Sequence, residues 1–432
     1  MFAGEEAAVE IAVIIGIIGI LIFLSHLLSE IFRRTKIPDV LSLFLLGLVV
    51  GPVFRLVTPA DFGAVGPVFT SVTLVIILFE SGVGLRINNL LKTMRPSLIL
   101  TVVNFVATVI LVGGTVWAFG EIGLKRSFML GAIVGGTSSA VVIPLVAQLR
   151  IRDESRAILV LESALSDVLC IVFALAFLAA YKIGDLRVGA LVGQILSSFL
   201  LAGIIGGVAA FLWSILLNRI RAFRNSLFTT PAFVFVVFAL TEVLGFSGAI
   251  AALTFGVALG NAGFLRFPIL KRYTLPEPLA PNDTEKAFFS EIVFLFKTFF
   301  FVYIGLSIQF GNFLWLCLGV DITLLIFILR IAVVRFSLQG AAPPADLATM
   351  AAIVPKGLAA AVLASLALQE NIPGGEFIQN ITYVVILFSI IGTSALVFLI
   401  DRLPASSLYI RLVSPTSAAQ QDNIKSSDPV SE

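Results

Sequence analysis

The sequence carries little charge for its length. Of its 432 residues, 12% are Asp, Glu, Lys or Arg, and 59% are apolar. Soluble domains carry about 25% charged residues, so this chain lacks the polar groups that would cover a water-exposed surface of its size. A net charge of +2 gives no basic surface for nucleic acid. The composition therefore predicts a protein embedded in lipid.

Residues that serve enzymes and cofactor sites are also scarce. His26 is the single histidine and has no metal-ligand neighbours, so we interpret it as a packing or interfacial residue. Cys170 and Cys317 lie in apolar runs, which indicates packing residues rather than a disulfide or a metal pair. The sequence has no Gly-x-x-x-x-Gly-Lys-Ser/Thr phosphate loop. We therefore expect no cofactor, no nucleotide site and no enzymatic activity.

The apolar residues form continuous runs of membrane-spanning length. A spanning helix needs about 20 mostly apolar residues, whereas membrane strands alternate in polarity. We predict an all-α polytopic membrane protein of about thirteen transmembrane helices. The predicted spans are 9–31, 37–53, 64–84, 96–119, 127–149, 155–181, 188–217, 229–245, 247–264, 286–308, 312–335, 346–369 and 376–401. Acidic rather than basic residues precede the first run, which favours an uncleaved first helix.

The distribution of lysine and arginine predicts an orientation. Basic residues favour cytoplasmic loops, and the loops around Arg33, Arg86 and Arg150 fall on one side if the N-terminus is outside. We therefore predict a multi-pass protein of the cell membrane with its N-terminus outside and its C-terminus in the cytoplasm. The tail 403–432 is rich in Ser, Pro, Asp and Gln, and we predict that it is disordered.

A few charged side chains lie inside the predicted spans. Such a charge costs at least ~2.5–3.5 kcal/mol, so each is a functional candidate or half of a structural ion pair. The span 155–181 carries Glu162, Ser163, Ser166 and Asp167, and residues four apart share a helix face. Adjacent carboxylates repel, which predicts one ion-paired acid and one free acid. A free carboxylate beside hydroxyls suits a small hard cation or a proton, but not both at once.

Two spans are interrupted near their centres by glycine or proline. The interruptions read Gly135-Gly136-Thr137-Ser138-Ser139 and Val354-Pro355-Lys356-Gly357. Freed backbone groups at membrane depth are tolerated only where they line a cavity or are buried in protein. Paired interruptions in two halves of a chain indicate the transport site of an inverted-repeat carrier. Arg330 lies near mid-depth and is the expected partner of Glu162, with Lys356 as the second choice.

These residues together resemble the prokaryotic sodium/proton antiporters of the monovalent cation:proton antiporter superfamily, over about residues 10–402. The similar stretches are Leu78–Gly82, Gly131–Val142, Glu162-Ser163-x-x-Ser166-Asp167, Phe301–Ser307, Arg330 and Pro355-Lys356-Gly357. The resemblance implies a homodimer, with a scaffold for dimerisation and a six-helix core that contains two crossed discontinuous helices. It divides the chain into scaffold helices (1–95 and 219–311), core helices (96–186 and 312–402) and a linker helix (187–218).

The resemblance also assigns roles to residues. Asp167 would be the transport carboxylate and Ser163 and Thr137 the other cation ligands. Ser166 and Glu80 would complete the cation- and proton-binding group, with Glu80 contributed from the scaffold. Glu162 and Arg330 would form the core ion pair, and the helix crossing would contain Ser138, Ser139, Lys356 and Gly357.

The chain departs from the family pattern at three places, and these shape the expected activity. Family members often have Asn-Asp or Asp-Asp at 166–167, Thr-Asp-Pro at 137–139, and Arg at 356. With one free carboxylate, we predict roughly one-for-one, electroneutral exchange of Na⁺ for H⁺ by alternating access. Li⁺ and K⁺ are alternative cations, and lipid is the surrounding partner. A sodium-coupled symporter of an organic solute and a cation channel with a related core are alternative functions.

Overall fold

The computed structural model describes residues 16, 19–20, 22–27, 30, 39–57, 65–84, 87–183, 188–220, 226–262, 281–308 and 312–402. Most of the predicted first span 9–31 and the predicted disordered tail 403–432 lie outside the described residues. The helices are α2 (Asp39–Leu48), η1 (Val49–Val53), α3 (Val65–Gly84), α4 (Ile87–Phe119), α5 (Leu124–Ile133), α6 (Ser139–Ala147), α7 (Asp153–Ile183), α8 (Val188–Ile220), η3 (Ser226–Phe228), α9 (Thr229–Val243), α10 (Gly248–Gly260), α11 (Asp283–Ser307), α12 (Phe313–Ser337), α13 (Pro344–Ala352), α14 (Leu358–Gln369) and α15 (Gly375–Arg402).

The described helices coincide with the predicted spans. Six of them (α4, α7, α8, α11, α12 and α15) are long and apolar enough to cross a membrane, and α3, α9, α10 and α14 are shorter apolar helices. A helix satisfies its backbone hydrogen bonds internally, which lipid requires of a spanning segment. The prediction of an all-helical, multi-span membrane protein is confirmed, and the total of about thirteen spans stays a prediction.

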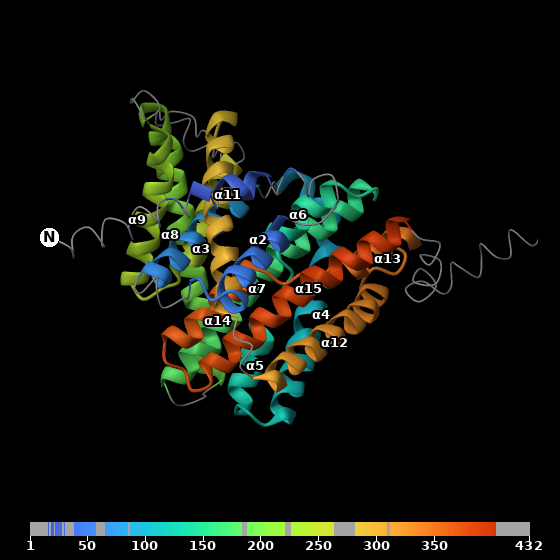
Figure 1. The fold of residues 1–432 in the computed structure, drawn as a ribbon. Helices are drawn as coiled ribbons and strands as arrows, with labels where there is room; N and C mark the ends of the chain where they lie inside the picture. The colour runs from blue at the N-terminus through green and yellow to red at the C-terminus, as the bar shows by residue number, and fades with distance from the viewer. Residues whose placement is uncertain are drawn as a thin grey trace, which may run out of the picture.

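The helices pack into two groups that stand side by side in Figure 1. The first group contains α2, α3, α8, α9, α10 and α11, in which α10 packs against α3 and α8, and α11 against α2. Helix α10 approaches α3 closely because Gly256 lies against the Phe79 carbonyl, where a Cβ would clash. The second group contains α4–α7 and α12–α15. Helix α8, which covers the predicted linker 187–218, packs against α10 and α9 of the first group. The division into a dimerisation scaffold, a linker and a transport core stays a prediction.

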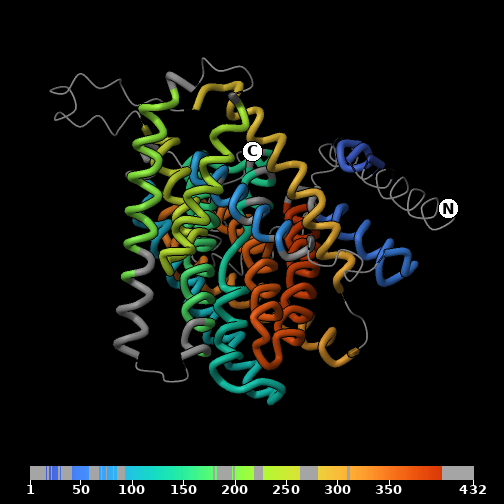
Figure 2. The backbone as a smooth tube through the Cα atoms, turned by 90° about the vertical axis from the view of Figure 1, so that its left-hand side faces the viewer, coloured from blue at the N-terminus to red at the C-terminus, as the bar shows by residue number. Residues whose placement is uncertain are grey.

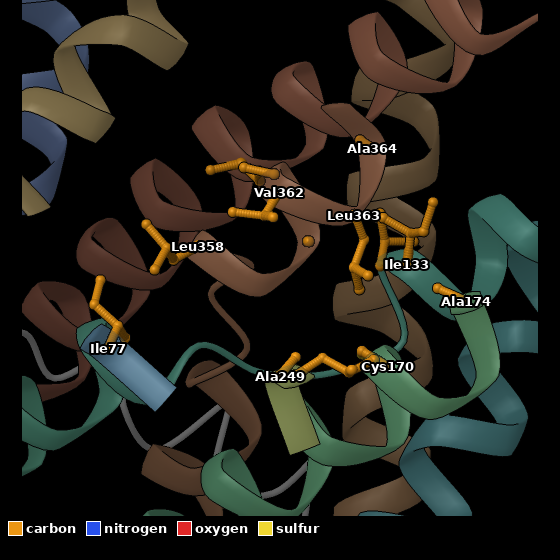
Figure 3. Packing of buried hydrophobic residues seen from close by; sticks show 14 of the residues in the cluster. Ile77, Ile133, Cys170, Ala174, Ala249, Leu358, Val362, Leu363 and Ala364 are labelled. Atoms are coloured by element: carbon orange, nitrogen blue, oxygen red, sulfur yellow. The ribbon is translucent and has the colours of Figure 1, made fainter. Parts of the chain in front are cut away.

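The boundary between the two groups is apolar. Helix α14 packs against α3, and α7 packs against α8. Figure 3 shows this boundary, where Ile77 of α3, Leu358 of α14, Ala249 of α10 and Cys170 of α7 belong to one buried cluster. The long helices α8 and α15, one from each group, both run along the vertical of Figure 2. One cluster of buried apolar residues therefore extends across both groups.

The predicted spans 127–149 and 346–369 are each split into two half-helices. Helix α5 is followed by residues 134–138 and then α6, and α13 is followed by residues 353–357 and then α14. The breaks therefore lie where the sequence places its glycines and proline, inside the second group.

Candidate functional site at two broken helices

The first break is shaped by two glycines. At Gly135 a Cβ would lie 2.7 Å from the Phe105 ring, and at Gly136 it would lie 2.7 Å from the Cys170 sulfur. Such distances are shorter than carbon contacts allow, so the backbone reaches this position only without side chains. The chain is then free of helical geometry from Val134 to Ser138.

The second break is shaped by Pro355 and held from α15. Proline has no N–H and disfavours a helical conformation in the preceding residue. The amide of Val354 instead donates to Thr393 Oγ1 at 3.3 Å, and the amide of Lys356 donates to Ser389 Oγ at 2.9 Å. Hydroxyls of a neighbouring helix therefore satisfy backbone groups that the break would leave unpaired.

The two breaks contact each other. The Ser138 amide donates to the Pro355 carbonyl at 2.8 Å, and Lys356 Nζ donates to the Gly136 carbonyl at 2.8 Å. A Cβ at Gly357 would overlap the Ser138 side chain, so glycine is required there. The Lys356 ammonium stands at the C-terminal end of α5, where a positive charge offsets the helix dipole. The structure thus brings together the residues that the sequence places at the crossing.

Asp167 lies on α7 beside the N-terminus of α6 and is half-buried. Its Oδ2 accepts hydrogen bonds from Ser139 Oγ at 2.7 Å and from the Ser139 amide at 3.4 Å. The N-terminus of a helix favours a negative charge. Lys356 acts on Asp167 electrostatically, but within the described residues no cation forms an ion pair with Asp167. No described residue forms a hydrogen bond with Oδ1, so this oxygen can accept a proton or contact a cation.

Glu162, five residues before Asp167 on α7, has both of its carboxylate oxygens bound. Arg330 of α12 donates Nη1 to Glu162 Oε1, and Nη2 to Oε2 at 2.7 Å. Both side chains are buried, and Arg330 Nε also donates to the Met350 carbonyl at 3.3 Å, near the end of α13. The structure pairs the two residues that the sequence analysis pairs, which leaves Asp167 as the carboxylate without a cation at this site.

The hydroxyls assigned to cation binding form hydrogen bonds with groups other than Asp167, and their role as cation ligands stays a prediction. Ser166 Oγ accepts from the Thr137 amide at 3.0 Å and lies 3.2 Å from Thr137 Oγ1. Ser163 Oγ donates to the Val160 carbonyl of its own helix at 2.9 Å. No hydrogen bond in the described part of the chain joins these hydroxyls to Asp167. The hydroxyl that does contact Asp167 belongs to Ser139, which the sequence analysis places only at the crossing.

Glu80 lies away from these contacts, in the first helix group. It is half-buried on α3 and lines a small pocket with Phe79, Pro231 of α9 and Phe289 of α11. The charge of Lys297 on α11 acts on it. Among the described residues no hydrogen bond or ion pair connects Glu80 with Asp167.

The groups present at this position are oxygen donors. They are the single carboxylate of Asp167 and the Ser139 hydroxyl, and oxygen is the ligand that hard cations prefer. Over the ranges that the structure describes, no cluster of three or more His, Cys, Asp or Glu residues could hold a metal ion.

The sequence is similar to a family model and to several antiporters. The family model described as "Sodium/hydrogen exchanger, transmembrane" matches residues 19–400. Na(+)/H(+) antiporter 1 of Methanocaldococcus jannaschii is 29% identical over 173 residues, which are 38% of this chain and 39% of the relative. The K(+)/H(+) antiporter NhaP of Alkalimonas amylolytica is 26% identical over 257 residues, which are 57% of this chain and 43% of the relative. The alignments thus span less than half of each relative.

The fold also matches a solved structure. The sodium proton antiporter MjNhaP1 from Methanocaldococcus jannaschii at pH 8 has a TM-score of 0.73 with 21% sequence identity, over 89% of this chain and 100% of that one. This likeness shows a common fold. Because the family model spans nearly all of the described helices, the chain belongs to the transmembrane sodium/hydrogen exchanger family.

Proposed function

We propose that this protein exchanges a monovalent cation, Na⁺ before Li⁺ or K⁺, for H⁺, and that the two ions compete for Asp167. The observation that carries the proposal is the different state of two neighbouring acids. Both oxygens of Glu162 are bound by Arg330, whereas Ser139 is the one residue that forms a hydrogen bond with Asp167 in the part of the chain that the structure describes. The names of the relatives, which include a Na(+)/H(+) and a K(+)/H(+) antiporter, support a cation and leave its identity between the two.

Competition for one carboxylate couples the two fluxes. A proton on Asp167 removes the negative charge that attracts the cation, and a bound cation removes the charge that attracts the proton. Each ion therefore leaves the site before the other binds. The Glu162–Arg330 pair and Lys356 keep their partners throughout, so only Asp167 changes its occupant.

Neutralisation of Asp167 also explains how movement follows binding. The boundary between the helix groups is lined by apolar residues such as Ile77 and Leu358 (Figure 3). Moving a bare carboxylate along such a surface is costly, whereas a protonated or cation-loaded carboxylate is neutral. The second helix group then moves against the first and exposes Asp167 to the two sides of the membrane in turn. Asp167 carries the cation in one direction and the proton in the other, and it is neutral in both. The exchange is therefore electroneutral.

The remaining predictions about assembly and location belong to the same proposal. The protein is a transporter of the cell membrane rather than an enzyme, with its N-terminus outside and its C-terminus in the cytoplasm. It functions as a homodimer through the scaffold helices. The adjoining linker helix α8 exposes apolar side chains such as Leu200, Ile204 and Leu212. Exposed leucine and isoleucine on a spanning helix suit lipid or a second copy.

Exchange is tested in proteoliposomes that contain a pH-sensitive dye. Addition of Na⁺, Li⁺ or K⁺ outside vesicles loaded with acid should drive proton efflux for the transported cation. The Asp167→Asn variant should fold and show no exchange, because an amide cannot bind a proton in this way. Asp321→Asn is the matched control, since Asp321 is an exposed residue of α12. Cation-driven proton efflux in Asp167→Asn at the wild-type rate would refute the proposal.

Electroneutrality has its own measurement. On a supported membrane, a Na⁺ jump should give no steady current above that of Asp167→Asn. A sustained current that scales with the exchange rate would require a second charge and would contradict the one-carboxylate mechanism.

A further inference from the structure

Each break packs against two side chains that lie one helical turn apart on a neighbouring helix. We call such a pair of side chains a clamp. After the first break, Ser166 of α7 accepts the Thr137 amide, and Cys170, four residues later, lies with its sulfur beside the Gly135 and Gly136 amides. After the second break, Ser389 of α15 accepts the Lys356 amide, and Thr393, four residues later, accepts the Val354 amide. In the second half, hydroxyl acceptors one helical turn apart thus hold backbone amides two residues apart. In the first half, Ser166 holds one amide, and the Cys170 sulfur packs beside the preceding glycines.

The clamp in the second half lies outside the proposed ion site. Neither Ser389 nor Thr393 has a contact with Asp167 among the described residues, and both are completely buried. No sequence motif marks either residue. An amide without an acceptor in such surroundings is strongly unfavourable, so the two hydroxyls fix where the chain of the second break lies.

A continuous set of contacts leads from this clamp to Asp167. Ser389 holds the backbone of Lys356, whose ammonium reaches the Gly136 carbonyl at 2.8 Å. The neighbouring Pro355 carbonyl accepts the Ser138 amide at 2.8 Å. The next residue is Ser139, whose hydroxyl and amide hold Asp167. Each link is a single hydrogen bond or one step along the chain.

We propose that Ser389 and Thr393 are positioning residues for the cation site at Asp167, a role that rests on the proposed exchange function. They do not touch the ion. They set the position of the second break, which in turn sets the donors that orient the carboxylate. Loss of one hydroxyl changes the geometry of the cation-bound state while leaving Asp167 and helix α7 in place.

This role predicts an effect on affinity more than on rate. A buried amide that loses its acceptor changes an equilibrium constant by roughly one to two powers of ten if it stays unpaired. For Ser389→Ala and Thr393→Val we expect the half-saturating Na⁺ concentration to rise about tenfold, while the maximal exchange rate stays within about twofold of wild type. Ser389→Thr and Thr393→Ser keep the acceptor and should restore the wild-type concentration.

Thr382→Val provides the matched control. Thr382 lies on the same helix and is equally buried, but its hydroxyl donates only to the Ile378 carbonyl of its own helix at 2.7 Å. This variant removes a buried hydroxyl from α15 without touching a break. Its half-saturating Na⁺ concentration should equal that of wild type.

The experiment measures exchange against Na⁺ concentration for all five variants in the same vesicles, with size-exclusion profiles as the test of folding. A rise in each of Ser389→Ala and Thr393→Val that folds, which the conservative variants reverse and Thr382→Val lacks, would support the inference. If Ser389→Ala does not fold, the nearly isosteric Thr393→Val carries the test. Wild-type affinity in the folded Thr393→Val, or an equal loss in Thr382→Val, would overturn the positioning role alone. Absence of exchange in wild type would overturn the proposed function and this inference with it.

Discussion

Replacement of Glu162 by leucine tests the buried ion pair. Leucine is close to glutamate in volume, so the change removes the two acceptors of Arg330 without leaving a large cavity. The Arg330 side chain has 0% exposure, and its remaining bond is to the Met350 carbonyl. Breaking a buried pair from one side costs about 3–5 kcal/mol. We therefore expect the folding equilibrium of Glu162→Leu to fall by roughly two to four powers of ten.

The assay is thermal unfolding of the purified protein in detergent, followed by size-exclusion fluorescence. The double variant Glu162→Leu/Arg330→Met should recover most of the loss, because it leaves no unpaired charge in the interior. Asp321→Asn, on the exposed side of α12, should unfold at the wild-type temperature. The reasoning would be refuted if Glu162→Leu were as stable as wild type. It would also be refuted if the stability lost by the double variant equalled the losses of Glu162→Leu and Arg330→Met added together.

Three further predictions follow from the site. Ser139→Ala removes the hydroxyl 2.7 Å from Asp167 and should raise the half-saturating Na⁺ concentration several-fold, whereas Ser139→Thr should not; exchange assays in vesicles compare them. Gly357→Ala places a Cβ on the Ser138 side chain and should lower stability by about 1–3 kcal/mol as well as exchange, measured by thermal unfolding and dye assay; wild-type stability would contradict the close crossing. Because protons compete with the cation, the half-saturating Na⁺ concentration should rise as pH falls, by about tenfold per pH unit where the site is protonated; a pH-independent value measured across a pH series would exclude competition.

The helices and their breaks were accessible to sequence reasoning because lipid imposes few solutions. An apolar run must be helical, so the predicted span 229–245 lies close to α9 (Thr229–Val243), and the predicted span 312–335 to α12 (Phe313–Ser337). The Gly135-Gly136 pair and Pro355 mark positions where a helix cannot continue at low cost. The pairing of Glu162 with Arg330 follows from the cost of a lone buried charge.

The partner of Asp167 was not accessible in the same way. The hydroxyl that contacts the carboxylate is set by the rotation of α6 against α7 and by the residue at which α6 begins. Neither can be predicted from the neighbouring residues in the sequence. Ser163 illustrates the difficulty, since its hydroxyl satisfies the Val160 carbonyl of its own helix. A Ser or Thr hydroxyl in a helix can bond to the backbone of its own helix or to a neighbouring element. The contacts of Ser389 and Thr393 with the second break therefore could not be predicted from the sequence.

The central claim is that one carboxylate, Asp167, is occupied in turn by a proton and by the cation. Calorimetric titration of the purified protein with Na⁺, in buffers of different ionisation enthalpy, counts the protons released per cation bound. At a pH where the site is protonated, we predict about one proton released by wild type and none by Asp167→Asn. Sodium binding to wild type without proton release, or equal release in Asp167→Asn, would contradict the account.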